Sequence, residues 1–433
     1  MSKNGDFDWP PRSRDLTTPD FFLWGYLKSK VYVNKPKTLE ELKTNIRQEI
    51  TAIPIMLKKT MENSLNVLHD FQVDRLEYQI VVDPDNHQVF EEPLFLIQLP
   101  IILKFKYFYS ALKDRTTSVP ESKMDWTQYH QLDDIYSWLD YLASQYSNIL
   151  KRFTIGYSYE GRPIKAVIIS LKKGNKAIFM DSNIHAIEWI SSATLTCFLF
   201  KLLTSNDPEV RQLLWDYDWI FVPVVNPDGL EYTHKTHPLW RKNRKPTGFF
   251  NESGICYGTD LNRNFDYHWN GAGYNIKVPC DHWYGGAKPD SEPEVTVLQQ
   301  FIKSFRAGYI RVYTAVHSYG NMLLLPFGHT TTERPPNYKQ MMIIAEGFAK
   351  SAQKQYNTTF RYGSSSELNY PVSGAAKDWA YGQGIPFTVT IELRDNGTYG
   401  FFLPANQIKE VCGEFTDGMV GMMKAARETE LFN

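Results

Sequence analysis

The stretch Ala177-Ile-Phe-Met-Asp-Ser-Asn-Ile184, which runs directly into His185-Ala-Ile-Glu188, decides the expected fold and the site on it. Its first part is mostly apolar and predicts a buried strand. The second part places an imidazole and a carboxylate, three residues apart, at the end of that strand. These groups suit zinc, but a catalytic zinc needs three protein ligands and an open position, so a distant third ligand is required. Without that ligand, the spacing is more typical of a surface or hydrogen-bonded histidine beside an unrelated glutamate.

Strands and helices alternate on both sides of this stretch. Further strands are predicted at residues 166–171, 219–225, 311–317 and 387–393, and helices at residues 132–150 and 190–203. A long loop region, residues 226–294, holds much of the Gly, Asn, Asp and Trp. Short apolar strands that alternate with helices predict an α/β fold, in which helices cover both faces of one sheet.

Two of these strands end in residues that could act on a metal ion. His317 ends one strand, and Glu392 lies near the end of another. Open α/β sheets place their sites beyond the carboxyl ends of the strands, so His317 is the predicted third ligand beside His185 and Glu188. A carboxylate is costly to bury unless it is paired or used. Glu392 is therefore predicted either to take a proton from a water molecule as general base or to pair with Arg394.

Composition sets limits on the partners of the chain. The 433 residues include 47 basic and 48 acidic side chains, a balance that indicates neither nucleic acid nor a membrane surface as partner. Residues 1–14 are polar and give no sign of an export signal. The longest apolar run, residues 94–103, is far shorter than the roughly 18–20 residues that span a bilayer.

A series of motifs in fixed order makes one family resemblance specific. They are Ser158-Tyr-Glu-Gly-Arg-Pro163, His185-Ala-Ile-Glu-Trp-Ile190, Val225-Asn-Pro-Asp-Gly229, Trp240-Arg-Lys242, Asp260-Leu-Asn-Arg-Asn264, His317-Ser-Tyr319, Asp378-Trp379, and Ile391-Glu-Leu-Arg-Asp395 with Tyr399-Gly-Phe401. Residues 124–433 thereby resemble the pancreatic-type (A/B) zinc metallocarboxypeptidases. The resemblance implies a mixed parallel and antiparallel sheet of about eight strands between helices. It also implies one Zn²⁺ per chain and the removal of single residues from the C-termini of peptides.

The resemblance also assigns roles, position by position within the motifs. His185, Glu188 and His317 resemble the zinc ligands, and Glu392 resembles the general base that activates a water molecule. Arg241 resembles the cation that stabilises the oxyanion, a role that fits the charge developing on the scissile carbonyl oxygen.

Other residues resemble those that hold the substrate. Asn262 and Arg263 resemble the pair that holds the free carboxylate, for which a guanidinium fork is suited. Tyr370 resembles the mobile tyrosine that closes over the bound C-terminal residue. Ser318 and Tyr319 follow the third ligand and are expected to contact the substrate as well.

Lys377 stands where the family has the specificity-determining residue of its pocket, on a count without gaps from Tyr370 to Asp378. In the family, an apolar residue there goes with apolar or aromatic substrates, and an Asp goes with Lys and Arg substrates. A buried ammonium needs an anion, which leads to the hypothesis of a preference for C-terminal Glu or Asp. Alternatively, Lys377 extends to solvent or pairs with a resident carboxylate, and the specificity is apolar.

The four cysteines bear on the cellular compartment. Cys256 and Cys280 bracket one polar, Gly-rich loop and resemble the loop disulfide of the family. A disulfide indicates an oxidising compartment, and the resemblance implies an extracellular enzyme although no signal peptide is visible. The sequence leaves open whether Cys197 and Cys412 are free thiols.

The N-terminal part departs from the family. The stretch Trp9-Pro-Pro-Arg-Ser-Arg-Asp-Leu-Thr-Thr-Pro-Asp-Phe-Phe-Leu-Trp-Gly25 resembles the C-terminal end of the catalytic domain of mariner-like transposases. Asp20 would match the last metal-binding carboxylate there, but the other carboxylates and their sheet are missing, so no nuclease activity is expected. We therefore expect a transposase-like fragment at residues 1–70, a prodomain remnant with a linker at 71–123, and a catalytic domain at 124–433. Whether the first part is a true fusion or a gene-model artefact stays open.

The leading interpretation is a monomeric carboxypeptidase that acts on peptide or protein C-termini. A second is a metal-binding pseudoenzyme that serves as a peptide-binding module, against which the intact Glu392 argues. A third is a transposon-derived DNA-binding protein, against which the near-neutral charge argues.

Overall fold

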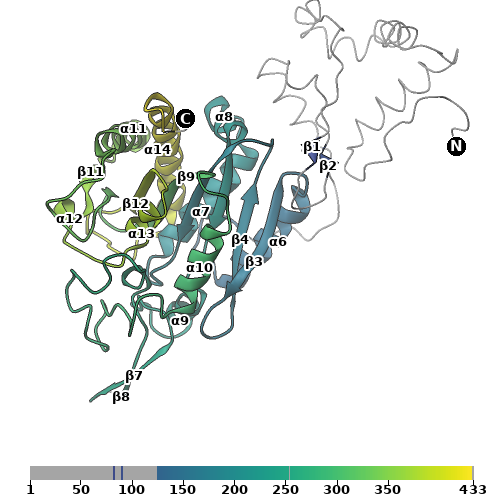
Figure 1. Cartoon of the computed structure of the whole chain (residues 1–433). Coiled ribbons are helices and arrows are strands. Elements are labelled where there is room, and N and C mark those ends of the chain that lie inside the picture. Colours follow the sequence, from purple (N-terminus) through teal and green to yellow (C-terminus); the bar gives the residue numbers. More distant parts are fainter. Residues whose placement is uncertain (1–80, 83–88, 91–123, 253, 432–433) are drawn as a thin grey trace, which may run out of the picture. The chain divides into compact units, whose positions relative to one another are not determined.

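The structure is a computed structural model that describes residues 81–82, 89–90, 124–252 and 254–431 (Figure 1). The chain divides into two units, Met1–Ser118 and Val119–Asn433. Strands β1 (Val81–Val82) and β2 (Val89–Phe90) pair antiparallel in the first unit. The predicted transposase-like fragment at residues 1–70 lies outside the described residues, and so does nearly all of the predicted prodomain remnant and linker at 71–123.

The second unit is built on a mixed sheet of eight strands, in the order β11-β10-β12-β9-β5-β6-β4-β3. The strands are β3 (Leu150–Tyr157), β4 (Pro163–Ile169), β5 (Lys176–Ser182), β6 (Tyr217–Val222), β9 (Ile310–Ser318), β10 (Met322–Leu325), β11 (Arg361–Ser364) and β12 (Phe387–Leu393). The central strands β6, β5, β9 and β12 run parallel, whereas β3, β4 and β10 pair antiparallel with neighbours. The predicted fold class, a mixed sheet between helices, is confirmed.

Helices cover both faces of this sheet, as Figure 1 shows. They are α6 (Leu132–Gln145), α7 (Trp189–Thr204), α8 (Pro208–Asp216), α9 (Pro227–Lys235), α10 (Pro293–Lys303), α11 (Tyr338–Tyr356), α12 (Ser365–Leu368), α13 (Ala376–Gly382) and α14 (Ile408–Glu428). Phe198 of α7 packs against Trp219 and Phe221 on one face of β6. The residue between them, Ile220, points to the opposite face because side chains alternate along a strand. That face carries the core cluster with α10 and α13, whose members include Phe179, Ile220, Val222, Val295, Leu298, Tyr313, Ala315, Ala376 and Trp379.

The central strands were the easiest elements to predict. Every residue of β6 and nearly every residue of β5 and β9 is buried, as expected for parallel strands that are covered on both faces. The helix predicted at residues 132–150 is wrong at its end: it stops at Gln145, and Leu150 begins the edge strand β3. Four consecutive residues of β3 are exposed, so no apolar run marks it as a strand.

The predicted loop region 226–294 is also more ordered than expected. It contains α9, the short helix Leu261–Arg263, and a hairpin of β7 (Pro246–Asn251) and β8 (Gly254–Tyr257). Helix α9 begins where Asn226 caps it, since its side chain accepts a hydrogen bond from the Gly229 amide at 2.9 Å. The motif Asn-Pro-Asp-Gly is therefore a helix start, with Pro227 at the first position.

Two disulfides cross-link the second unit. Cys256–Cys280 joins β8 to the loop that follows, as the family resemblance implied. Cys197–Cys412, which the sequence left open, joins α7 to α14 across 215 residues of chain. Both of these cysteines are buried, at 5% and 0% exposure.

Candidate active site

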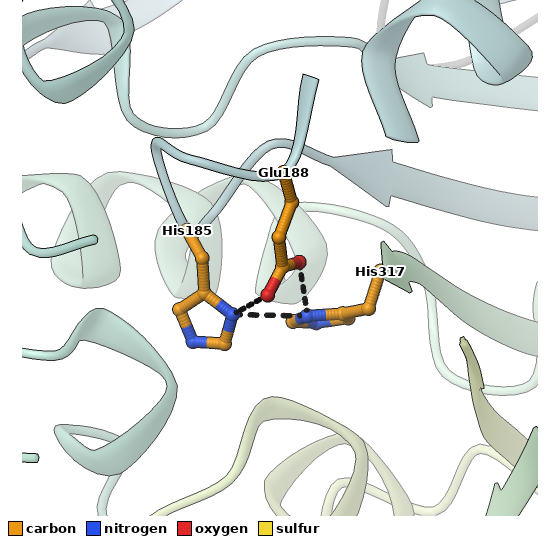
Figure 2. A group of neighbouring side chains, drawn as sticks. All are labelled: His185, Glu188 and His317. Atoms are coloured by element: carbon orange, nitrogen blue, oxygen red, sulfur yellow. Dashed lines mark hydrogen bonds and ion pairs between the residues drawn. The ribbon is translucent and has the colours of Figure 1, made fainter. Parts of the chain in front are cut away.

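The three predicted ligands meet at the carboxyl edge of the sheet. His185 and Glu188 lie in the turn between β5 and α7, and His317 is near the end of β9. Figure 2 shows the three side chains converging from these two segments. Nδ1 of His185 lies 2.7 Å from Oε1 of Glu188, Nδ1 of His317 lies 2.9 Å from Oε2, and the two Nδ1 atoms are 3.1 Å apart. All three side chains are buried.

This donor set fits a catalytic zinc ion. Two imidazole nitrogens and one carboxylate are a known set of protein ligands for such a site, and they leave one position open. Two ligands at zinc-nitrogen distances in a tetrahedron stand about 3.3 Å apart, close to the observed separation of the two Nδ1 atoms. His185, Glu188 and His317 are also the one group of three or more potential ligands that converges in the described part of the chain.

The turn that carries two of the ligands is held by its neighbours. The amide of Ala186 donates to the carbonyl of Arg241 at 2.9 Å. Helix α9 packs against the same turn, and a Cβ added to Gly229 would come within 2.7 Å of the Ala186 Cβ. Any larger residue at position 229 would push the ligand turn away, which explains the glycine of the Asn-Pro-Asp-Gly motif.

Asp260 links the first ligand to Arg241. Its Oδ1 lies 3.0 Å from Nε2 of His185, and its Oδ2 accepts from Nε of Arg241 at 2.9 Å. Although burial opposes it, the charges of Arg241 and Arg263 hold the pKa of Asp260 well below its usual range. Asp260 is therefore an anion that orients the ring of His185. The motif that contains it was recognised from the sequence, but this role was not.

Arg241 points toward the ligand group. Its Nη1 lies 3.5 Å from Oε1 of Glu188, and its guanidinium stacks over Trp283 with 4.8 Å to the ring centroid. These contacts fix a cation beside the ligands, where the resemblance places the oxyanion.

Glu392 lies beside His317, since the two residues are partners in the register of β12 and β9. Burial raises the pKa of Glu392 to about 7, and nearby Glu188 acts in the same direction against the opposing charge of His317. The alternative of an ion pair with Arg394 is wrong: Arg394 pairs with Glu410 and Glu414 of α14.

The predicted substrate residues gather around the same edge. Arg263 donates to the hydroxyl of Tyr370 at 3.0 Å, and Asn262 Oδ1 accepts from the amide of Ala376, at the start of α13. The Ser318 amide faces Oε2 of Glu188 at 3.3 Å. Tyr319 packs edge-on against Phe401 and stays 37% exposed.

Lys377 is buried in α13, with 2% of its surface exposed. Its Nζ lies 3.1 Å from Oδ1 of Asp378, and Oδ2 of Asp378 accepts from the Gly328 amide at 2.7 Å. The alternative that Lys377 extends to solvent is therefore wrong, and the alternative of a resident carboxylate is present in the structure.

Three ligands that suit one metal ion, beside a buried carboxylate at the carboxyl edge of a mixed α/β sheet, are typical of a metal-dependent hydrolase. Residues 135–418 match the model of the peptidase M14 family, the zinc carboxypeptidases, and the chain belongs to that family.

Individual relatives agree with this assignment. The chain is 43% identical to a zinc carboxypeptidase of Simulium vittatum over 308 residues, which are 71% of this chain and 99% of the relative. It is 35% identical to carboxypeptidase O of Homo sapiens over 343 residues, 77% of this chain and 90% of the relative. Among solved structures, carboxypeptidase A of Helicoverpa armigera superposes with a TM-score of 0.65 at 27% identity, covering 79% of this chain and 83% of that one.

The chain is thus a metal-dependent exopeptidase that uses one Zn²⁺ and acts on the C-termini of peptides. Among the described residues, none of the helices has the length and apolar character that crossing a membrane requires.

Proposed function

We propose that this chain removes single C-terminal residues through His185, Glu188 and His317 as zinc ligands, Glu392 as general base and Arg241 as oxyanion partner, with a preference for C-terminal Glu or Asp. Zinc, when bound, supplies Lewis acidity and lowers the pKa of water. The observation that carries the assignment is the convergence of the Nδ1 and Oε atoms of the three ligands, with Glu392 paired in register to His317.

Glu392 meets the requirements of the base. A general base works best when its pKa lies near the working pH, and the pKa of Glu392 is raised to about 7 by burial. A proton taken from water can pass to the leaving amine from the same carboxylate. Arg241 is held by Asp260 and Glu188, so its charge is already in place when the carbonyl oxygen becomes negative.

Arg263 and Tyr370 are positioned to hold the terminal carboxylate. The Arg263 Nη2 donates to the Tyr370 hydroxyl, so both groups face one space. The guanidinium also lies over Trp283, with 5.6 Å to the ring centroid. Asn262 fixes the start of α13 through its Oδ1 and keeps its amide N–H groups for the substrate.

Lys377 supports the acidic preference because its ammonium is buried at the pocket position. An ammonium has three N–H donors, and among the described residues its one polar partner is Asp378. The carboxylate of Asp378 accepts one hydrogen bond from Lys377 and another from the Gly328 amide. Gly328 adds no side chain, and its missing Cβ would lie 3.0 Å from the Lys377 Nζ. The same ion pair also favours the competing candidate, a neutral pocket for apolar residues, because it already satisfies part of the charge.

Blocked dipeptides that end in Glu, Phe or Arg distinguish these candidates. We expect the highest kcat/KM for Glu, and a loss of at least about 30-fold for Glu but not for Phe in Lys377→Met. Lys350→Met, on an exposed lysine, is the matched control. A higher kcat/KM for Phe than for Glu in the unmodified protein would show that the pocket is apolar.

The proposed function includes a cellular compartment and an oligomeric state. Two disulfides favour an oxidising, extracellular compartment. We propose a catalytic domain at residues 124–433 that acts as a monomer, with no nucleic acid or membrane partner, in keeping with its near-neutral charge. Gel filtration and DNA retention at low salt test the monomer and the absence of a nucleic acid partner.

A further inference from the structure

The two histidine ligands differ in what supports the far side of each ring. Both rings turn Nδ1 toward the ligand group, so in the neutral ligating form the proton is on Nε2. Nε2 of His185 lies 3.0 Å from Oδ1 of Asp260 and 2.8 Å from Nη2 of Arg241. Nε2 of His317 is buried and has no hydrogen-bond partner among the described residues. A ligating histidine nearly always donates its second N–H to a carboxylate, a carbonyl or water, so an acceptor for His317 is expected.

One buried carboxylate lies on the correct face of the sheet. Asp181 of β5 is opposite Ala315 of β9 in the parallel register. Since side chains alternate along a strand, Ala315 and His317 point to the same face, and Asp181 shares it directly below His317. Asp181 is fully buried, and neither of its carboxylate oxygens has a hydrogen-bond partner in the described part of the chain.

Two hydroxyl groups complete this polar group inside the core. Tyr313 lies two residues before Ala315 on the same face of β9, and Thr388 of β12 is opposite Tyr313. The hydroxyls of both are buried and lack partners among the described residues. Burial raises the pKa of Asp181 to about 6, while Tyr313 and His317 act to lower it. Four buried polar side chains on one face of three adjoining strands suit an internal water, which needs two to four polar partners.

We propose that Asp181 is a positioning residue for the zinc site, which holds the Nε2–H of His317 through one buried water molecule shared with the Tyr313 hydroxyl. Each histidine ligand then has its own carboxylate, Asp260 directly for His185 and Asp181 through water for His317. The bond fixes the tautomer of His317, and the negative charge makes its Nδ1 a better donor to a cation. The buried charge of Asp181 then stabilises His317 as a ligand when zinc is bound.

Two measurements on the full chain test the role of Asp181: the affinity for zinc and the stability of the zinc-free protein. In Asp181→Asn we expect the Kd for zinc, measured by competition with a chelator, to rise about 10–100-fold. The melting temperature of the zinc-free variant at pH 8 should stay the same or rise, because a buried carboxylate without a direct partner is removed. Thr314→Val is the matched control, since its hydroxyl is also buried and without a partner but lies on the other face of β9. This control should leave zinc affinity unchanged.

A spectroscopic measurement separates positioning from general packing. With Co²⁺ in place of zinc, each ligating imidazole gives a shifted, exchangeable N–H proton signal in the NMR spectrum. We expect two such signals in the unmodified protein. In Asp181→Asn, the N–H proton of His317 should exchange rapidly with solvent and its signal should be lost, whereas the His185 signal should remain. The idea is overturned if zinc affinity changes less than twofold, or if affinity and zinc-free stability fall in parallel.

The inference rests on the proposed assignment of His317 as a ligand, and the two can fail separately. His317→Ala tests the assignment: full zinc affinity in that variant would remove His317 from the site. Loss of affinity in His317→Ala together with unchanged affinity in Asp181→Asn would keep the zinc site and overturn only the role of Asp181.

Discussion

Replacing Cys197 and Cys412 together by alanine should destabilise the protein more than replacing Cys256 and Cys280. The first disulfide closes a loop of 215 residues and the second a loop of 24. The chain-entropy model gives about 5.4 kcal/mol for the longer loop and about 3.4 kcal/mol for the shorter one, a difference of about 2 kcal/mol. Cys197 and Cys412 are both buried, whereas Cys280 of the other pair is exposed, so the packing loss acts in the same direction.

Urea denaturation of the two double variants, followed by tryptophan fluorescence, measures this difference. The unmodified protein under reducing and oxidising conditions provides the control. We expect the midpoint to fall further for Cys197→Ala/Cys412→Ala, with activity retained in the folded fraction, since neither cysteine contacts the site. Equal midpoints for the two variants would refute the loop-length argument. A larger loss for Cys256→Ala/Cys280→Ala would show that the loop around β8 contributes more to stability than the junction of α7 and α14.

Three further predictions concern the site and its surroundings. Glu392→Gln should lower kcat by about 10²–10⁴-fold and leave bound zinc unchanged; a normal kcat would remove Glu392 as the base. Removal of zinc by a chelator should abolish release of C-terminal residues, and zinc at 100 times its Kd should restore activity and add about 2.7 kcal/mol of stability. Burial raises the pKa of Glu294 to about 7 from 4.5, so the unfolded state loses this proton first as pH rises. Stability should therefore fall by up to about 3 kcal/mol between pH 4.5 and 7, and Glu294→Gln should flatten that part of the profile in urea denaturation across pH.

The strands that could be predicted from the sequence are those whose burial alone determines their composition. Strands β5, β6, β9 and β12 are buried on both faces, so apolar residues predominate in them and marked them clearly. Strand β3 is an edge strand whose exposed residues look like the polar face of a helix, and β10 and β11 are only four residues each. These strands exist because neighbouring strands pair with them, which no local pattern reports.

The same distinction holds for the site. His185, Glu188, His317 and Glu392 could be proposed from the sequence because titratable residues are unusual at or just beyond the ends of buried strands. Lys377 and Asp378 are neighbours in the sequence, but whether they form an ion pair depends on how their side chains leave α13. The sequence therefore could not distinguish this ion pair from an ammonium that points at the substrate. The disulfide between Cys197 and Cys412 depends on two helices that meet from distant parts of the chain.

The placement of the ligands explains why the fold and the metal site depend on each other. Glu188 directly precedes α7, so the position of this ligand is fixed by how α7 lies on the sheet. Helix α7 is tied to α14 by Cys197–Cys412 and packs on β6 through Phe198. His317 comes instead from the central strand β9, whose neighbours on both sides hold it. The zinc site therefore joins an element that covers the sheet to the sheet itself, and bound zinc should stabilise the docking of α7 in addition to activating water.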